Sequence, residues 1–154
     1  MRLNEKELLV RKIENGTVID HIPSGKGLKV VEILKIGKDH DGSVIVLINA
    51  SSKKLGRKDV VKIENRELTK EETNKIALIA SSATINIIRD WEVVEKRKVS
   101  LPEMLEGIIK CPNSSCITNS NEPITTKFVV ERKAPLKLRC WYCERVFNES
   151  EITI

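Results

Sequence analysis

The motifs CPNSSC (residues 111–116) and CWYC (residues 140–143) hold all four cysteines of this 154-residue chain, with 23 residues between them. Two short loops that each offer two thiolates match the tetrahedral coordination of zinc with little backbone strain. The Cys-x-x-Cys pair suits the tip of a hairpin, and Pro112 with Asn113 predicts a tight turn whose N–H groups point at the sulfurs. The spacing therefore predicts one structural Zn²⁺ per chain. Its ligands are Cys111, Cys116, Cys140 and Cys143.

Two disulfide bonds are the main alternative use of these cysteines, and an iron site or a redox-active pair are others. The chain opens with MRLNEKE, and its longest apolar runs, residues 44–48 and 76–80, have five residues. We therefore expect neither a cleavable leader nor a membrane span, and we expect a cytoplasmic protein whose thiols stay reduced. Four thiolates leave no open coordination position, which argues against catalysis at the metal.

The charge is distributed unevenly along the chain. Residues 1–100 carry 20 Lys and Arg against 15 Asp and Glu, whereas residues 101–154 carry 7 against 7. This contrast predicts two domains, 1–100 and 101–154, joined by a polar linker at residues 95–102. Four thiolates around one zinc dication make the second domain net acidic. That balance disfavours the alternative of a zinc-ribbon protein that binds nucleic acid or assists transcription, because phosphate contact needs a basic face.

The first domain alternates strand and helix patterns. The expected strands are residues 9–22 with a turn at Asn15-Gly16, then 44–48, 59–64, 84–88 and 91–94. The expected helices run from 26 to 36 with Ser24 as N-cap, and from the capping box Thr69-x-x-Glu72 to about residue 80. The resulting α+β protein has a ferredoxin-like β-α-β-β-α-β sandwich with an antiparallel sheet. A small all-β zinc domain follows, with a miniature core expected from Trp141, Tyr142 and Phe147.

The residues of the first domain do not form a recognisable catalytic set, so a free-standing enzyme has no support. Asp20 and His21 are neighbours on an expected strand, where side chains point to opposite faces and cannot polarise each other. Gly25-Lys26-Gly27 is too short for a Walker loop. Basic residues cluster at 53–62 and 96–98. Brought together by the sheet, these clusters would bind a polyanion as small as a nucleoside triphosphate.

Five motifs spread over the chain resemble the regulatory chain of aspartate carbamoyltransferase, in the same order. They are GTVIDHIP (16–23), GRKD-x-x-KIEN (56–65), ATINII (83–88), SLPE (100–103) and CPNSSCI (111–117). The resemblance implies a regulator without catalytic activity. Its first domain would be the allosteric nucleotide domain, which pairs with its twin into a homodimer. Its zinc domain would dock on separate catalytic chains, which make carbamoyl-aspartate in the committed step of pyrimidine biosynthesis.

The resemblance also implies roles for individual residues. Cytidine triphosphate (CTP) as inhibitor and adenosine triphosphate (ATP) as activator would compete for one pocket, with uridine triphosphate as a further effector. Asp20 and Lys62 match residues around the ribose and base, and Lys96 matches the main triphosphate contact. The other matched nucleotide positions are His21, Lys58 and Asn86, the backbone of Ile13 and Trp91 at the base edge, and Val93 at the ribose. Asn113 and Glu144 match contacts with the catalytic chain, whereas Ser115 departs from the asparagine of better-known members.

Overall fold

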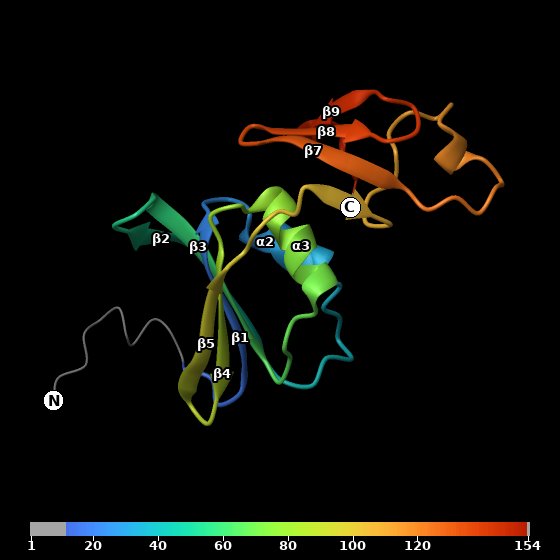
Figure 1. Ribbon diagram of the computed structural model, residues 1–154. Coiled ribbons are helices and arrows are strands. Elements are labelled where there is room, and N and C mark those ends of the chain that lie inside the picture. The colour runs from blue at the N-terminus through green and yellow to red at the C-terminus, as the bar shows by residue number, and fades with distance from the viewer. Residues whose placement is uncertain (1–11, 154) are drawn as a thin grey trace, which may run out of the picture. The chain divides into compact units, whose positions relative to one another are not determined.

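The computed structural model describes residues 12–153, and its N-terminal part is a five-stranded sheet in which every pairing is antiparallel (Figure 1). The strands are β1 (Gly16–Pro23), β2 (Val44–Ser52), β3 (Gly56–Glu64), β4 (Thr84–Arg89) and β5 (Glu92–Lys98). The helices are α2 (Gly27–Ile33) and α3 (Lys70–Ile79). Across the sheet the strands follow the order β2-β3-β1-β4-β5. This arrangement confirms the predicted α+β class and the β-α-β-β-α-β order, to which β5 adds an edge strand.

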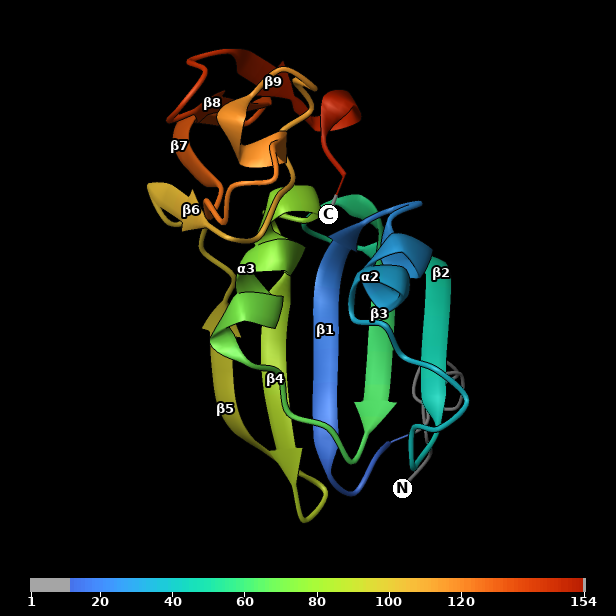
Figure 2. The ribbon, with the colours of Figure 1, turned by 90° about the vertical axis from the view of Figure 1, so that its right-hand side faces the viewer.

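Alternation along the strands gives this sheet two chemically different faces. Ile19 on β1 pairs with Val61 on β3 and with Ile85 on β4, and all three side chains are fully buried. α2 lies over this apolar face (Figure 2). The side chain of Asp59 on β3 meets Gly27 at the start of this helix. Residues of the opposite parity therefore line the other face, and most of the candidate nucleotide residues belong to that set.

The first helix is shorter than the sequence predicts. It ends at Ile33 because Lys35 has a φ of 52°, a left-handed conformation that stops a helix. Ser24 is not its N-cap, since that hydroxyl donates to a side chain on β2. The first amides instead donate to Asp59, whose Oδ2 lies 2.8 Å from the backbone nitrogen of Gly27.

The bounds and the buried face of the second helix agree with the prediction. α3 starts directly after Thr69, and Glu71 and Glu72 lie in its first turn, where carboxylates favour the positive end of the helix dipole. Ile76 and Ile79 are buried, as the apolar spacing predicts.

Several strand boundaries differ from the sequence-based expectation. β2 runs on to Ser52 and β3 begins at Gly56, so both strands are longer than the expected 44–48 and 59–64 and meet in a tight hairpin. Residues 95–98, expected in a linker, form the second half of β5, where they pair with residues 84–87 of β4. Their charges suit an edge strand, which is commonly protected by charged side chains. β1 begins at Gly16, and positions 9–11 of the first expected strand lie outside the described residues. Gly16 has a φ of 142°, and a Cβ there would lie 2.0 Å from the carbonyl oxygen of Ile63. A side chain therefore does not fit at this position.

The C-terminal part is a second antiparallel sheet, with the strand order β6-β7-β8-β9. Its strands are β6 (Met104–Glu106), β7 (Lys127–Lys133), β8 (Leu136–Cys140) and β9 (Val146–Asn148). Two single 3₁₀ turns, η1 (Ile117–Asn119) and η2 (Glu149–Glu151), complete it. Residues 141–145 join β8 to β9, which places the second cysteine motif at a hairpin tip as predicted.

The aromatic core of this sheet differs from the predicted one. Phe147 is buried as expected, but its partner is Phe128, with ring centroids 6.5 Å apart in an edge-to-face arrangement. Trp141 and Tyr142 are exposed, at 53% and 43% of their surface. Alternation explains the difference, because Leu138 and Cys140 on β8 point inward and the chain then turns at the hairpin tip.

The chain divides into two compact units. Among the described residues, one unit contains 12–69 together with 82–99, and the other contains 70–81 together with 100–153. The first unit therefore carries the five-stranded sheet with α2, and the second carries the four-stranded sheet with α3. Among the described residues, no helix is long and apolar enough to span a bilayer.

Candidate functional site

A row of cross-strand partners crosses the face of the N-terminal sheet opposite to α2. Val18 on β1 pairs with Lys62 on β3 and with Asn86 on β4, and Asn86 pairs in turn with Lys96 on β5. Directly paired residues project from the same face of a sheet. Strand register therefore brings two lysines and a side-chain amide from three distant parts of the sequence onto one surface.

This row lies in a hollow of about 400 Å³. The residues that line it are Lys12, Ile13, Val18, Asp20, Lys62, Asn86, Ile88, Trp91, Val93 and Lys96. Seven of the nine predicted nucleotide residues are in this set, all except His21 and Lys58. A second hollow of about 570 Å³ shares Val18, Asp20 and Lys62 with the first and adds Lys58. Three of the lining residues of the first hollow were not predicted from the sequence. Val18 and Ile88 could have been found, because each lies two residues from a predicted one, Asp20 and Asn86, on the same face of its strand. No sequence pattern marks Lys12.

The carboxylate of Asp20 is held by two positive or polar groups. The Nζ of Lys58 lies 2.8 Å from its Oδ1, and the backbone N–H of His21 donates to the same oxygen at 2.6 Å. Partial burial acts to raise the pKa of Asp20, but the ammonium of Lys58 and the N–H of His21 outweigh burial and hold the pKa below its usual value. Asp20 is therefore an anionic hydrogen-bond acceptor at neutral pH.

His21 lies at a β-bulge, where the predicted alternation of side chains fails. The register shifts between Ile19 and Ile22, and His21 has a φ of 57°. Its Nδ1 lies 3.1 Å from the hydroxyl of Thr84, which is the cross-strand partner of Asp20. The prediction that Asp20 and His21 point to opposite faces is therefore wrong, because the bulge turns the ring back toward the face of Asp20.

Lys62 is buried, which is unusual for a lysine. Burial lowers the pKa of its ammonium below the usual value, and the negative charge of Asp20 opposes that effect. The side chain of Lys62 projects into a hollow where water is partly excluded. A phosphate or ribose oxygen that reaches it there meets a poorly solvated charge, which strengthens the contact.

Trp91 lies in the two-residue turn between β4 and β5. Both turn residues have positive φ, 51° at Asp90 and 70° at Trp91, as a type I′ hairpin requires. Such a conformation costs a residue other than glycine on the order of 1–3 kcal/mol. The backbone N–H of Trp91 donates to the carbonyl of Glu14 at 2.9 Å. The N–H of Trp91 is therefore engaged within the protein.

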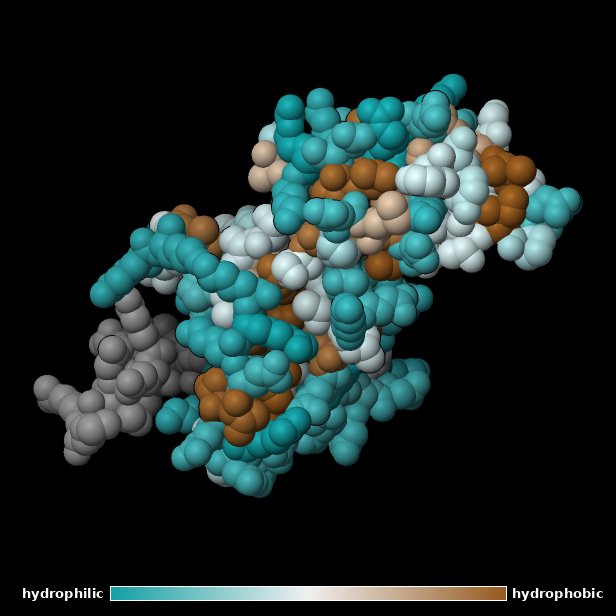
Figure 3. All heavy atoms as spheres, in the orientation of Figure 1, coloured by the Kyte–Doolittle hydropathy of each residue, from teal (hydrophilic) through white to brown (hydrophobic). Residues whose placement is uncertain are grey.

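The side chains beside Trp91 are apolar. Val93, which pairs with Ile88 across the hairpin, is 57% exposed, and Val94, the extra residue of a bulge, is 51% exposed. Figure 3 shows hydrophobic side chains gathered over this hairpin among hydrophilic neighbours. The hollow therefore has an apolar side toward the turn and a charged side at Lys62 and Lys96.

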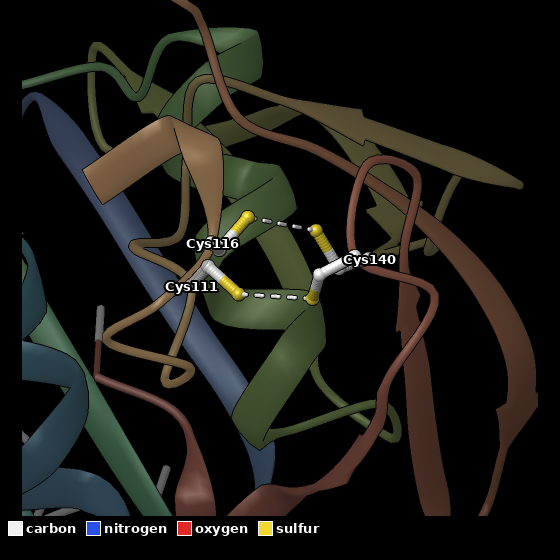
Figure 4. Close-up of side chains that lie close together, drawn as sticks. Cys111, Cys116 and Cys140 are labelled. Atoms are coloured by element: carbon white, nitrogen blue, oxygen red, sulfur yellow. Dashed lines mark hydrogen bonds between the residues drawn. The ribbon is translucent and has the colours of Figure 1, made fainter. Parts of the chain in front are cut away.

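The four cysteines converge in the C-terminal unit. Cys111 and Cys116 flank the loop before η1, Cys140 ends β8, and Cys143 lies in the hairpin tip. The sulfurs of Cys111 and Cys143 are 3.8 Å apart, those of Cys116 and Cys140 are 3.7 Å apart, and all four lie within 4.8 Å of one another (Figure 4). A disulfide has sulfurs about 2 Å apart. The four cysteines are therefore free thiols placed together as the ligands of one metal ion would be, and they do not form two disulfides.

Backbone N–H groups point at these sulfurs, as the predicted turn requires. The N–H of Asn113 donates to Cys111, and the N–H of Arg145 donates to Cys143. Burial raises the pKa of the Cys111 and Cys140 thiols. Burial also acts to raise that of Cys143, but hydrogen bonds from the Asn113 side chain, the Arg145 N–H and the neighbouring thiols lower this pKa to about 7. A metal dication supplies the positive charge that so many clustered thiolates need.

Two residues that support the metal loop were not identified from the sequence. The side-chain amide of Asn119 donates to the carbonyl of Cys111 at 2.9 Å and to that of Asn113 at 2.6 Å. The hydroxyl of Thr118 donates to the sulfur of Cys116 at 3.2 Å. Asn113 itself closes the loop, because its side-chain oxygen accepts the N–H of Ser115. Glu144 is exposed in the hairpin tip.

Comparison with known proteins places these two sites in one family. The family described as aspartate carbamoyltransferase regulatory chain, allosteric domain, matches residues 8–100. The companion description, aspartate carbamoyltransferase regulatory chain, metal binding domain, matches residues 103–153. The protein belongs to the aspartate carbamoyltransferase regulatory chain family.

Individual regulatory chains of the family are similar over nearly their whole length. That of Pyrococcus abyssi is 60% identical over 147 residues, which cover 95% of this chain and 96% of the relative. That of Ignicoccus hospitalis is 57% identical over 150 residues, 96% of each chain. That of Methanothrix thermoacetophila is 54% identical over 145 residues, 94% of each chain.

Membership in the aspartate carbamoyltransferase regulatory chain family assigns the protein to the regulatory chain and not to the catalytic chain. The two family descriptions fit the two sites. The hollow lies in the allosteric part, and the four cysteines lie in the metal-binding part.

Proposed function

We propose that this chain is the non-catalytic subunit that senses nucleoside triphosphates for aspartate carbamoyltransferase, with CTP as inhibitor and ATP as activator. Residues 1–100 form the nucleotide domain in this proposal. The observation that supports it best is the hollow, which gathers seven of the nine expected residues from the segment at Ile13 and from β1, β3, β4 and β5.

The chemistry of the hollow suits such a ligand. The ammonium of Lys96 offers charge to a triphosphate, and that of Lys62 donates to oxygens of the ribose and base. The carboxylate of Asp20, fixed by Lys58 and held in its anionic form, accepts hydrogen bonds from ribose hydroxyls. The carbonyl of Trp91 accepts from an exocyclic amino group, which both cytosine and adenine carry.

We further propose that the metal is zinc. A tetrahedron with Zn–S bonds of about 2.3 Å has sulfurs roughly 3.8 Å apart along its edges. The distances of 3.8 Å between Cys111 and Cys143 and 3.7 Å between Cys116 and Cys140 fit those edges. Zinc held by four thiolates has no open position, so its role is to fix the two loops against each other.

Residues 101–154 form the docking domain in this proposal. The metal loops carry Asn113 and Glu144, the two residues expected to contact a catalytic chain. Asn113 is engaged inside its own loop through its side-chain oxygen and its carbonyl, so loss of the metal would displace it. We propose that two regulatory chains pair through their nucleotide domains, and that the assembly works in the cytoplasm on pyrimidine biosynthesis.

The mechanism is thermodynamic linkage. A nucleotide that binds one quaternary state better than the other shifts the catalytic chains toward that state, with a coupling that is typically about 1–3 kcal/mol. The chain itself needs no reactive group for this role. It needs two sites on rigid elements, and each proposed site is built on its own sheet.

Two measurements test the proposal together. Calorimetric titration of the full-length chain with CTP and ATP is expected to show one competitive site, and a catalytic chain is expected to co-purify only while the metal is bound. The nucleic-acid alternative would be favoured if the chain gave no heat of binding with CTP or ATP and instead bound DNA or RNA with an affinity that falls steeply with salt. Absence of both nucleotide binding and complex formation would overturn the proposal.

A further inference from the structure

We propose that the indole ring of Trp91 stacks on the base of the bound nucleotide and favours purines over pyrimidines. The inference rests on the proposed nucleotide function and adds a side-chain contact to the backbone role expected at this position.

Folding does not account for a tryptophan in this turn. Both turn residues are left-handed, a conformation that asparagine, aspartate and glycine adopt most easily and that is strained for a bulky side chain. The ring does not serve the core either, because Trp91 is 59% exposed. A residue that strains the backbone and leaves its large apolar side chain in water is expected where that side chain binds something.

The place of Trp91 in the lining of the hollow supports a base as the partner of its ring. Asn86 and Lys96 pair in the charged row, and Ile88 pairs with Val93 one step closer to the turn that carries Trp91. Along these strands the lining of the hollow therefore changes from charged to apolar to aromatic. A nucleotide has the same sequence of properties, from phosphates through ribose to a flat base.

The backbone of the turn is fixed in a way that suits stacking. The N–H of Trp91 is held by the carbonyl of Glu14 at 2.9 Å, and the N–H of Asp90 is bonded to the side chain of Asn15 at 3.2 Å. Both contacts anchor the turn to Glu14 and Asn15, the two residues that follow Ile13, and Ile13 itself lines the hollow. A platform anchored before the ligand arrives loses little entropy on binding.

The ring also predicts a preference. Stacking on an aromatic side chain increases with the overlapping area, and a purine covers a bicyclic indole more completely than a pyrimidine does. Loss of the ring is therefore expected to weaken ATP binding more than CTP binding, and to leave binding of inorganic tripolyphosphate unchanged.

The first test is spectroscopic. The chain has two tryptophans, so Trp141→Phe leaves Trp91 as the only indole in the full-length chain. Titration with ATP is expected to quench its fluorescence, whereas tripolyphosphate is expected to leave it unchanged. If calorimetry shows nucleotide binding while the emission stays constant, stacking is refuted and the proposed function stands. If calorimetry shows no nucleotide binding, both fall.

The second test separates stacking from a structural role. Trp91→Asn keeps a residue that tolerates positive φ and removes the ring, and Trp91→Tyr restores an aromatic face. We expect Trp91→Asn to weaken ATP binding by about tenfold, with a smaller loss for CTP and most of the loss recovered in Trp91→Tyr. An equal loss for ATP and tripolyphosphate in Trp91→Asn would mean that the hollow itself has been disturbed, and it would overturn the stacking role.

Discussion

The ammonium of Lys58 on β3 lies 2.8 Å from the carboxylate of Asp20 on β1, beside the bulge that places His21 at positive φ. The pair occupies the boundary between the two hollows. Because Lys58 holds Asp20 in its anionic form, it prepares a hydrogen-bond acceptor before any ligand arrives.

Asp20→Asn is expected to reduce the dependence of stability on acid pH. The pKa of Asp20 is lower in the folded state than in the unfolded chain, so its contribution is present above about pH 4 and is lost as the pH falls through the folded pKa. For a partly exposed pair the contribution is on the order of 1 kcal/mol. Urea denaturation at pH 7 and at pH 3 measures it, and an unchanged difference between the two pH values in Asp20→Asn would contradict it.

Lys96→Ala is expected to abolish the nucleotide response while assembly with catalytic chains survives. Lys96 projects into the hollow from an edge strand, so its removal takes away a triphosphate contact without opening a core. Arg97→Ala is the matched control. Arg97 is the next residue on β5, and it pairs with Ile85 of β4, so it projects from the face of the sheet away from the hollow. Calorimetric titration with CTP compares the two variants, and unchanged affinity in Lys96→Ala would refute the assignment.

Nucleotide affinity is expected to fall as the pH rises, and to begin falling at a lower pH than it would if Lys62 had the usual pKa of a lysine. The pKa of Lys62 is lowered, and a bound nucleotide, which is an anion with acceptor oxygens, favours the protonated ammonium, so affinity is lost as the pH rises through this pKa. Lys62→Arg keeps a charge over the whole range and is expected to flatten the profile. CTP titrations between pH 7 and pH 10 would show the difference, and coincident profiles would exclude Lys62 as a nucleotide ligand.

Most of the arrangement that matters for function could be predicted from the sequence, because it follows from short-range patterns. The spacing of the two cysteine pairs predicts that the four sulfurs come together, and alternation along β1 and β3 places Asp20 and Lys62 on one face. The errors occur where one residue departs from its pattern. The left-handed conformations of His21 and Lys35 produce a bulge and an early helix end, and neither residue type by itself predicts such a conformation.

The remaining errors have a different physical origin. The charged residues 95–98 suggested a linker, yet the same composition protects the outer edge of β5. Trp141 and Tyr142 suggested a core because aromatic residues are usually buried, but the hairpin tip leaves no sheet to cover them. In each case, sequence composition is compatible with two environments, and the pairing of distant strands decides between them.

Asp59→Ala is expected to destabilise the chain by roughly 3 kcal/mol. Hydrogen bonds to a charged group are worth about 1.5–3 kcal/mol, and their loss leaves buried N–H donors without an acceptor. The fully buried carboxylate accepts three backbone N–H groups, from Gly25, Gly27 and Asn49. Asp39→Ala, at an exposed turn position, is the control. Equilibrium denaturation measures both variants, and equal stability would contradict the role of Asp59.

Cys116→Ser, or removal of the metal with a chelator, is expected to unfold the C-terminal sheet and detach the chain from its catalytic partner. Binding of a structural zinc ion contributes on the order of 10 kcal/mol to the folding of such small domains. Thr118→Val is the control, because it removes only the hydroxyl that donates to the sulfur of Cys116. Calorimetric titration of Cys116→Ser with CTP should still show binding, since the hollow is built on the other sheet. Co-purification with catalytic chains and metal content per chain provide the measurements. A metal-free chain that still binds its partner would show that the four cysteines do not maintain the docking surface.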